Sequence, residues 1–199
     1  MGLREEKKRR QRREIVDVAL GLFRERGYDQ TRVSDIARGA VISEATFFNY
    51  FSSKEFVLDE LALAQIELFS ETLRYQLNVE DVSVPERIRE TMRVAAAAIA
   101  ADQEFQAVLY TRSNLFHSSG VLKARTHEMY RLLASLFELG QQRGEIRGDA
   151  DPLQLAEVLI AIYHLTTINW LTRWWDGREG LQPRLGAATE VFLSGCRSQ

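Results

Sequence analysis

The stretch SEATFFNYFSSKE, residues 43–55, carries four aromatic rings within five positions, at Phe47, Phe48, Tyr50 and Phe51. At ~100° per residue, a helix through this stretch turns the first and last of these rings to one side, and the other two flank them. Ala45 and Asn49 fall on the opposite side. The pattern therefore predicts a short helix that buries two rings, exposes a small polar face, and depends on packing for its stability.

The residues before this stretch also have helical spacing. One helix is expected from about Arg9 to Arg26, with Gly27 as the C′ residue just after its end, and a second, short one over TRVSDIARGA, residues 31–40. The expected buried positions are Ile15, Ala19, Leu22, Phe23, Val33, Ile36 and Ala37. A break of a few residues then leads to Ser43 as an N-cap. Two short helices joined in this way describe a helix-turn-helix, whose second helix can lie in a DNA major groove.

The rest of the chain also favours helices. SSKE at residues 52–55 is interpreted as a capping box, with Ser52 at the N-cap and Glu55 at N3, and it opens a helix from Ser53 to about Leu77. Ser83 with Pro85 and Asp151 with Pro152 mark two later helix starts. Further helices are expected over 84–101, 103–114, 121–145, 152–175 and 182–196. No segment alternates with period two for long, so the predicted fold class is all-α.

Charge is unevenly distributed along a chain whose net charge is only −2. Residues 1–54 hold 12 Lys or Arg against 8 Asp or Glu, whereas the remaining residues hold 14 against 20. Seven of the basic residues stand in the opening run: Arg4, Lys7, Lys8, Arg9, Arg10, Arg12 and Arg13. Such a run can be a solvated tail. Beside a compact unit of short helices, it favours phosphate binding.

The surroundings of the protein can also be inferred from composition. Cys196 is the single cysteine, which excludes an internal disulfide and fits a reducing cytoplasm. The first fourteen residues are charged and no apolar segment of a signal peptide follows them. The longest apolar stretch, residues 153–175, is interrupted by polar residues and favours a buried helix over a membrane span. We therefore expect a soluble cytoplasmic protein without membrane contact.

Residues 27–61, GYDQTRVSDIARGAVISEATFFNYFSSKEFVLDEL, resemble the DNA-binding headpiece of the tetracycline-repressor (TetR) family of bacterial regulators. The matching features are Gly27-Tyr28, Thr31, Val33, Ile36-Ala37, Ser43, Thr46, Phe47-Phe48, Tyr50-Phe51, Lys54-Glu55 and Leu58. The resemblance implies a three-helix headpiece with a helix-turn-helix, followed by about six helices that bind a ligand and form a dimer. The implied domains are residues 1–52, with the basic arm and the DNA-binding helices, and residues 53–199.

The chain departs from the family pattern at two positions. The family usually has Gly in the turn where this chain has Val41, and a β-branched residue is poorly suited to a positive φ. We expect the turn to follow a different path that uses Gly39. The second helix of the family normally begins with a Ser or Thr cap where this chain has Arg32. We expect Thr31 to replace that cap one residue earlier and to leave Arg32 free to reach a phosphate.

The resemblance also implies which residues contact DNA. The expected set is Arg32, Ser34, Glu44, Ala45, Thr46, Phe48, Asn49, Tyr50 and Lys54. Asn49 can pair with adenine through two hydrogen bonds, and the methyl groups of Ala45 and Thr46 can touch a thymine methyl. Tyr50 and Lys54 suit backbone phosphates. Tyr50 could instead be a core aromatic, and Glu44 could simply complement the helix dipole.

Catalytic and metal sites find little support. The three histidines, His117, His127 and His164, are far apart and lack metal-site spacing. No nucleophile elbow, P-loop or dinucleotide fingerprint occurs. We therefore expect no enzyme activity, no catalytic residue, no metal and no cofactor. Two alternatives to a regulator stay open: a helical small-molecule-binding protein, and a nonspecific DNA binder without a regulatory switch.

Sparse polar or aromatic side chains on the mostly apolar later helices can orient a small hydrophobic or amphipathic effector. The candidates are Tyr110, Asn114, His117, Tyr163, Thr167 and Trp170. A core or interface position would explain any one of them equally well. The segment 153–175 is apolar on nearly all sides, and LGAATEVFL at 185–193 offers small residues beside it. Together they predict a homodimer through two helices of each chain. By resemblance, the dimer is a repressor that a small molecule releases from a palindromic DNA operator.

Overall fold

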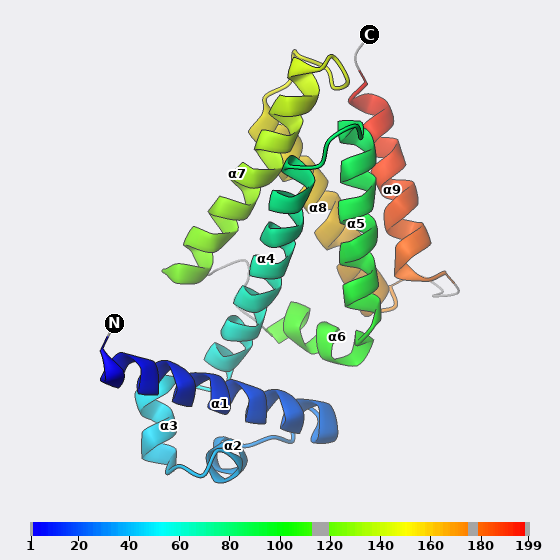
Figure 1. Ribbon diagram of the computed structural model, residues 1–199. Coiled ribbons are helices and arrows are strands. Elements are labelled where there is room, and N and C mark those ends of the chain that lie inside the picture. Colours follow the sequence, from blue (N-terminus) through cyan, green and yellow to red (C-terminus); the bar gives the residue numbers. More distant parts are fainter. Residues whose placement is uncertain (1, 113–119, 175–178, 198–199) are drawn as a thin grey trace. The chain divides into compact units, whose positions relative to one another are not determined.

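The computed structural model describes residues 2–112, 120–174 and 179–197, and nine helices cover most of these ranges (Figure 1). They are α1 (Leu3–Arg26), α2 (Val33–Gly39), α3 (Glu44–Tyr50), α4 (Glu55–Leu77), α5 (Val84–Ala100), α6 (Gln103–Arg112), α7 (Val121–Gln142), α8 (Pro152–Leu171) and α9 (Leu181–Gly195). Within the described ranges, the strand-like pairing is limited to one bridge between Ile146 and Arg197. The predicted all-α fold class is confirmed.

Two helices begin elsewhere than predicted. α1 starts at Leu3 and not near Arg9, so the basic run is itself helical. Arg, Lys and Glu are good helix formers, and this explains how the helix continues through a charged segment. α4 starts at Glu55, so this residue is the first of the helix and not its third, and the predicted capping box is wrong. The Glu55 carboxylate instead accepts a hydrogen bond of 2.9 Å from the Tyr28 hydroxyl.

The chain divides into two compact units, and both α4 and α6 pass from one unit to the other. The first unit contains α1, α2, α3, the part of α4 up to Leu63, and the end of α6 from Val108. The second contains the remainder of α4 and α6 together with α5, α7, α8 and α9. The headpiece predicted for residues 1–52 thus lies within the first unit.

In the first unit, α2 packs against both α1 and α3 (Figure 1). Ile15, Ala19 and Phe23 form the buried side of α1. Gly39 is the last residue of α2, and a Cβ atom at this position would lie 2.6 Å from Cγ1 of Val18. The absence of a side chain at Gly39 therefore permits the close approach of α2 to α1.

The turn between α2 and α3 keeps a left-handed residue at Val41, with φ of 54°. The amide of Val41 donates to the carbonyl of Arg38, and the amide of Ile42 donates to the carbonyl of Ala37. These two bonds form a Schellman motif, the usual C-terminal closure of a helix with a left-handed residue. The prediction that Gly39 would provide the turn is therefore wrong, because Gly39 is needed inside α2.

In the second unit, four helices form a closed group in which α7 packs on α8, α8 on α9, α9 on α5, and α5 on α7. Phe137 of α7 and Phe192 of α9 meet edge to face, with ring centroids 5.9 Å apart. Ser83 and Asp151 cap α5 and α8 as predicted, through side-chain oxygens that accept from the amides of Glu86 and Gln154. Side chains join α4 to this group, through the ring contact of Phe69 with Tyr163 on α8 and the ion pair of Arg74 with Glu128 on α7.

Candidate functional site

The short helix α3 presents one face to the protein and another to solvent, as its sequence predicts. Phe47 is fully buried and Phe51 is 2% exposed, and their ring centroids lie 5.7 Å apart. On the other side, Glu44, Ala45, Phe48 and Asn49 are exposed, while Thr46 and Tyr50 are half-buried. The residues expected to face a DNA groove are thus brought together on one surface.

Ser43 begins α3 as predicted. Its Oγ accepts a hydrogen bond of 3.0 Å from the amide of Thr46 and lies 2.8 Å from the Thr46 hydroxyl. A seven-residue helix has few internal hydrogen bonds, so a cap at its N-terminus contributes much to its definition.

The N-terminus of α2 differs from the prediction. Arg32 is itself the N-cap residue, and its backbone amide donates to a carboxylate oxygen of Asp35 at 3.1 Å. Thr31 is buried, and its hydroxyl lies 2.9 Å from the carbonyl oxygen of Gly27. Thr31 therefore closes the end of α1 and does not cap α2. The side chain of Arg32 is exposed, and Ser34 is half-buried.

Lys54, predicted to contact phosphate, is engaged within the headpiece. Its Nζ donates to the carbonyl oxygens of Tyr28 at 2.8 Å and of Thr31 at 3.1 Å, and it lies 4.1 Å from the centroid of the Tyr28 ring. Burial and the hydrogen bond to Glu55 raise the pKa of the Tyr28 hydroxyl. A hydrogen bond from Ser53, more than any other cause, lowers the pKa of Glu55. Lys54 has a structural role here, and at most one of its three donors is left for a phosphate.

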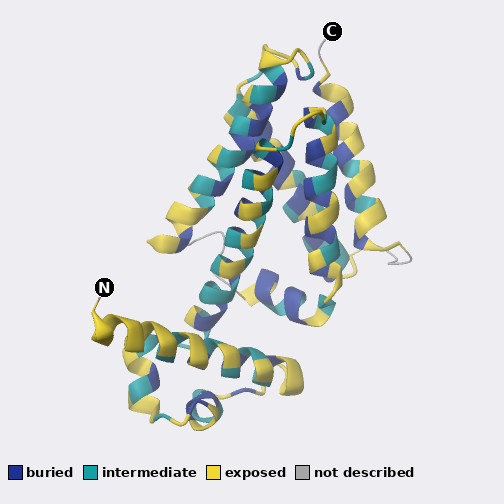
Figure 2. Ribbon diagram, in the orientation of Figure 1, coloured by how far each residue is buried: buried dark blue, intermediate teal, exposed yellow. Residues whose placement is uncertain are grey.

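The basic run forms the exposed first part of α1 (Figure 2). Residues 4–10 are all exposed, so the positive charges of Arg4, Lys7, Lys8, Arg9 and Arg10 are available to a polyanion. Arg12 is different. Its Nη1 lies 2.6 Å from the carbonyl oxygen of Tyr50, and its Nη2 lies 2.6 Å from Oε1 of Glu60. The sequence did not distinguish Arg12 from the solvated charges, because nothing in the pattern of a basic run sets one arginine apart from the next.

Of the residues predicted to bind a ligand, Asn114 and His117 lie outside the described residues. Tyr110 is buried on α6 and belongs to the first unit. The other three lie on α8 in the second unit, where Tyr163 and Thr167 are buried and Trp170 is half-buried. The structure therefore groups Tyr163, Thr167 and Trp170 on one helix and assigns Tyr110 to a different unit.

The buried side of α8 combines aromatic and polar groups. The Tyr163 ring lies 6.0 Å from that of Phe69 on α4. One turn further along α8, the Thr167 hydroxyl is buried and has no hydrogen-bond partner among the described residues. The same holds for Oε1 of Gln106 on α6, a residue that sequence reasoning missed. Burial of an unsatisfied polar atom is unfavourable, and a ligand that supplies the missing partner relieves it.

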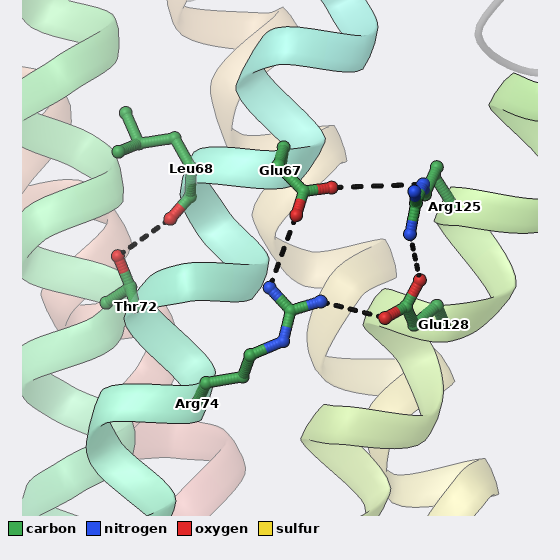
Figure 3. Close-up of polar contacts among 6 residues, drawn as sticks. All are labelled: Glu67, Leu68, Thr72, Arg74, Arg125 and Glu128. Carbon is green, nitrogen blue, oxygen red and sulfur yellow. Dashed lines mark hydrogen bonds and ion pairs between the residues drawn. The ribbon is translucent and has the colours of Figure 1, made fainter. Parts of the chain in front are cut away.

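Four side chains of α4 and α7 form a closed ring of alternating charge (Figure 3). Arg74 lies 3.3 Å from Glu67 and 2.8 Å from Glu128, and Arg125 lies 2.7 Å from Glu128 and 4.0 Å from Glu67. The hydrogen bonds from Arg125 and then from Arg74 hold the pKa of Glu128 below its usual range. Because the four charges cancel, the ring orients α4 on α7 without adding net charge.

Exposed apolar side chains mark the outer faces of α8 and α9. Val158, Leu165 and Val191 are 50%, 62% and 75% exposed. Because α8 packs on α9, these exposed apolar residues lie on two adjacent helices, where a protein–protein interface could cover them.

Two classes of site find no support among the residues that the structure describes. No group of three or more His, Cys, Asp or Glu side chains there is arranged to hold a metal ion. No helix in the same ranges combines the length and the apolar character needed to cross a membrane.

Comparison with known proteins relates this geometry to one family. A profile described as "Bacterial regulatory proteins, tetR family" matches residues 15–61. The HTH-type transcriptional repressor DhaR of Mycobacterium sp. (strain GP1) is 30% identical over 155 residues, which are 75% of this chain and 77% of that protein. The fatty acid metabolism regulator protein of Bacillus subtilis (strain 168) is 24% identical over 190 residues, 94% of this chain and 95% of that protein.

A solved structure agrees over nearly the whole chain. It is that of Thermus thermophilus FadR, a TetR family transcriptional repressor, in complex with lauroyl-CoA. The TM-score is 0.76 at 25% identity, and the match covers 92% of this chain and 94% of that chain. These relatives are regulators and not enzymes. The profile match spans α1, α2, α3 and the first turns of α4, and the longer matches extend through the second unit, so the chain belongs to the TetR family of bacterial regulatory proteins.

Proposed function

We propose that this protein is a ligand-responsive transcriptional repressor that a small molecule releases from a near-palindromic DNA operator. The observation that carries the proposal is the exposed face of α3, where Glu44, Ala45, Phe48 and Asn49 stand outward on a helix fixed from behind by two buried rings. A helix held in this way can be inserted into a major groove without losing its own packing.

Each side chain on this face has a role that its chemistry suits. Asn49 can hydrogen-bond the N6 and N7 positions of an adenine, and Ala45 and Thr46 can contact a thymine methyl. Phe48 can add apolar contact at the edge of the groove. The exposed basic residues of the run, Arg4, Lys7, Lys8, Arg9 and Arg10, together with Arg32, supply phosphate contacts that fix the register of the protein on the duplex.

For the effector, we propose a long-chain acyl-CoA. Thermus thermophilus FadR was solved with lauroyl-CoA, and the Bacillus subtilis relative is a fatty acid metabolism regulator. The second unit of this chain offers a matching environment of apolar helices with Phe69, Tyr163 and the unsatisfied polar atoms of Thr167 and Gln106. An aliphatic chain suits the apolar side chains, a carbonyl can accept from the Thr167 hydroxyl, and an amide N–H can donate to Oε1 of Gln106.

The switch uses the two helices that belong to both units. A ligand that displaces α4 in the second unit also moves the start of α4 in the first, because a helix transmits displacement along its axis. The end of α6 makes a second connection to the headpiece, through an ion pair in which Arg112 lies 3.3 Å from Asp29. Ligand and operator then favour different shapes of the protein, and each weakens the binding of the other by the same factor.

We further propose roles for the two parts of the chain and a dimer that binds the operator. Residues 1–52 serve DNA binding and residues 53–199 serve ligand binding and dimerisation. The exposed apolar faces of α8 and α9 pair with those of a second copy, and the two headpieces then meet two half-sites of one operator. The protein acts in the cytoplasm, where its DNA is.

Binding-site selection from random DNA tests the proposal most simply, and it should return a near-palindromic motif. Asn49→Ala should then relax the base preference and cost ~1–3 kcal/mol of operator binding. Asn78→Ala, an exposed asparagine of the second unit, serves as the control and should leave binding unchanged.

Lys54 can still reach a phosphate through its remaining donor, so Lys54→Ala should weaken binding to all DNA sequences alike. The same variant should lower the thermal stability, since Lys54 also donates to two backbone carbonyls. Equal affinity for selected and random DNA would instead identify a nonspecific DNA binder. Absence of DNA binding at low salt would leave only a small-molecule-binding protein.

A further inference from the structure

Arg12 stands in the basic run, but its guanidinium is directed toward the protein. Nη1 donates to the carbonyl oxygen of Tyr50 at 2.6 Å. Nε and Nη2 both donate to Oε1 of Glu60, at 3.1 Å and 2.6 Å. The guanidinium carbon also lies 4.1 Å from the centroid of the Phe51 ring. One side chain of α1 thus joins the last residue of α3, the residue after it, and the first part of α4.

The contact with Tyr50 is made at the C-terminus of α3, which is the recognition helix in the proposed function. The last carbonyls of a helix have no partner within it, and they carry the negative end of the helix dipole. A cation that donates to such a carbonyl is favourable there, and this one also lies over an aromatic ring. Since α3 has seven residues, the guanidinium and the Ser43 cap together fix both of its ends.

Glu60 balances the charge of Arg12 and adds the connection to α4. Both side chains are about one-third exposed, at 36% for Arg12 and 32% for Glu60, so the pair is only partly screened by water. The guanidinium has five donors in a fixed plane, and three of them are used here. One donates to the carbonyl of Tyr50, and two donate to the carboxylate of Glu60. A lysine ammonium is a point charge and cannot reproduce this planar arrangement.

We propose that Arg12 is a positioning residue for the recognition helix and that the Arg12–Glu60 pair transmits a displacement of α4 to α3. Arg12 then acts within the headpiece as part of the switch, and it is not one of the phosphate-binding residues of the basic run. The inference rests on the proposed function, since α3 is the DNA-reading helix only if the protein binds an operator.

Substitutions at Arg12 distinguish positioning from phosphate contact through the salt dependence of operator binding. Loss of a phosphate contact reduces the slope of log K against log salt by about 0.9 per subunit. Loss of positioning lowers the affinity but leaves that slope unchanged. We expect Arg12→Ala to weaken operator binding at least about tenfold, with an unaltered slope and a reduced preference for operator over random DNA.

Two further variants sharpen the test. Arg12→Lys keeps the charge and would preserve a phosphate contact, but we expect it to lose most of the operator affinity because the planar donor arrangement is lost. Glu60→Ala removes a negative charge, so electrostatics alone predicts tighter DNA binding. Positioning predicts weaker binding, and the double variant Arg12→Ala with Glu60→Ala should be little worse than either single one.

Two control variants remove one positive and one negative charge elsewhere on α1, to match the changes at Arg12 and Glu60. Arg13→Ala and Asp17→Ala change exposed residues that do not belong to the Arg12 contacts. We expect Arg13→Ala to change affinity only in proportion to its effect on the salt slope, and Asp17→Ala not to weaken binding. Circular dichroism must find all variants folded at the assay temperature, so that lost stability does not mimic lost positioning.

The inference is overturned if Arg12→Ala reduces the salt slope while Arg12→Lys binds like the wild type, or if Glu60→Ala binds operator as tightly as the wild type or tighter. Failure of the proposed function looks different, because the wild-type protein itself would then select no operator. With a selected operator in hand, the variants therefore test the positioning role alone.

Discussion

Val41 combines a β-branched side chain, a left-handed backbone and 90% exposure at the turn before the recognition helix. The left-handed region costs an L-residue about 1–2 kcal/mol, and an exposed side chain has little packing to offset that cost. The Schellman hydrogen bonds nevertheless hold the residue there, because they pair the amides of Val41 and Ile42 with two carbonyls at the end of α2.

Val41→Asn should therefore stabilise the headpiece by about 1 kcal/mol, because Asn tolerates the left-handed region. Val41→Gly should gain less, since glycine adds entropy to the unfolded chain. Urea unfolding of the variants measures the gain. A loss of stability with Asn would mean that the Val41 side chain makes a favourable contact that its exposure does not reveal.

His164 provides a prediction of pH dependence. It lies beside Tyr163, with ring centroids 5.2 Å apart, and desolvation lowers its pKa from 6.5 to about 4. Between these values the unfolded chain binds the proton and the folded protein does not. Stability should therefore decrease as the pH falls from about 6.5 to about 4, by at most about 3 kcal/mol, and the contribution should be constant above and below this window.

His164→Leu should remove this part of the pH dependence, whereas His127→Leu, at an exposed position, should keep it. Urea unfolding of both variants at pH 7 and pH 4.5 makes the comparison. An unchanged pH dependence in His164→Leu would assign the loss at low pH to the carboxylates.

Individual charged side chains were harder to predict than apolar ones. The ring pattern of α3 predicted the burial of Phe47 and Phe51, because burial follows directly from helical spacing. The roles of Arg12, Lys54 and Arg87 did not follow from any spacing. Arg87 is 1% exposed, and its Nη1 donates to the carbonyl oxygen of Gln76 at the end of α4. Which arginine turns inward depends on carbonyls that only the folded chain brings near.

Among the elements, α3 depends most on its ends. Seven residues form too short a helix to persist in water, so the helix exists because Phe47 is buried, Ser43 caps its start and Arg12 closes its end. The caps of α5 and α8 were predictable for the same reason as that of α3: Ser and Asp before a helical pattern have few other roles. The start of α4 could not be predicted from the local pattern, because Glu55 accepts a hydrogen bond from Tyr28, a residue distant in the sequence.

Ser43→Ala should lower the free energy of unfolding by about 1 kcal/mol and weaken operator binding. Ser83→Ala removes the equivalent cap from α5, where Oγ accepts from the amide of Glu86 at 3.4 Å. This control should cost a similar or smaller amount of stability but leave operator binding intact. Equal operator affinity in both variants would mean that the α3 cap does not matter for DNA recognition.

For the whole molecule, the proposed dimer depends on the outer faces of α8 and α9. The exposed Val158, Leu165 and Val191 extend across both helices, and burying such a surface provides the usual driving force of a stable dimer. An operator with two half-sites then requires the dimer and not the single chain.

Ala188→Arg combined with Val191→Arg should convert the dimer to monomers and abolish tight operator binding, because two new charges per chain would be buried in the interface. Leu68→Arg on α4, which changes a residue 57% exposed, serves as the control. Sedimentation at micromolar concentration distinguishes the species. A wild-type monomer, or a dimer that survives both substitutions, would place the interface elsewhere.

The coupling between ligand and operator tests the central proposal most directly. Lauroyl-CoA is titrated against the wild-type protein with and without its selected operator, and labelled operator is titrated with and without saturating lauroyl-CoA. We expect each to weaken the binding of the other by the same factor, typically about 5–150-fold. Equal affinities for lauroyl-CoA in the two titrations, or no measurable binding of it, would contradict the proposed switch.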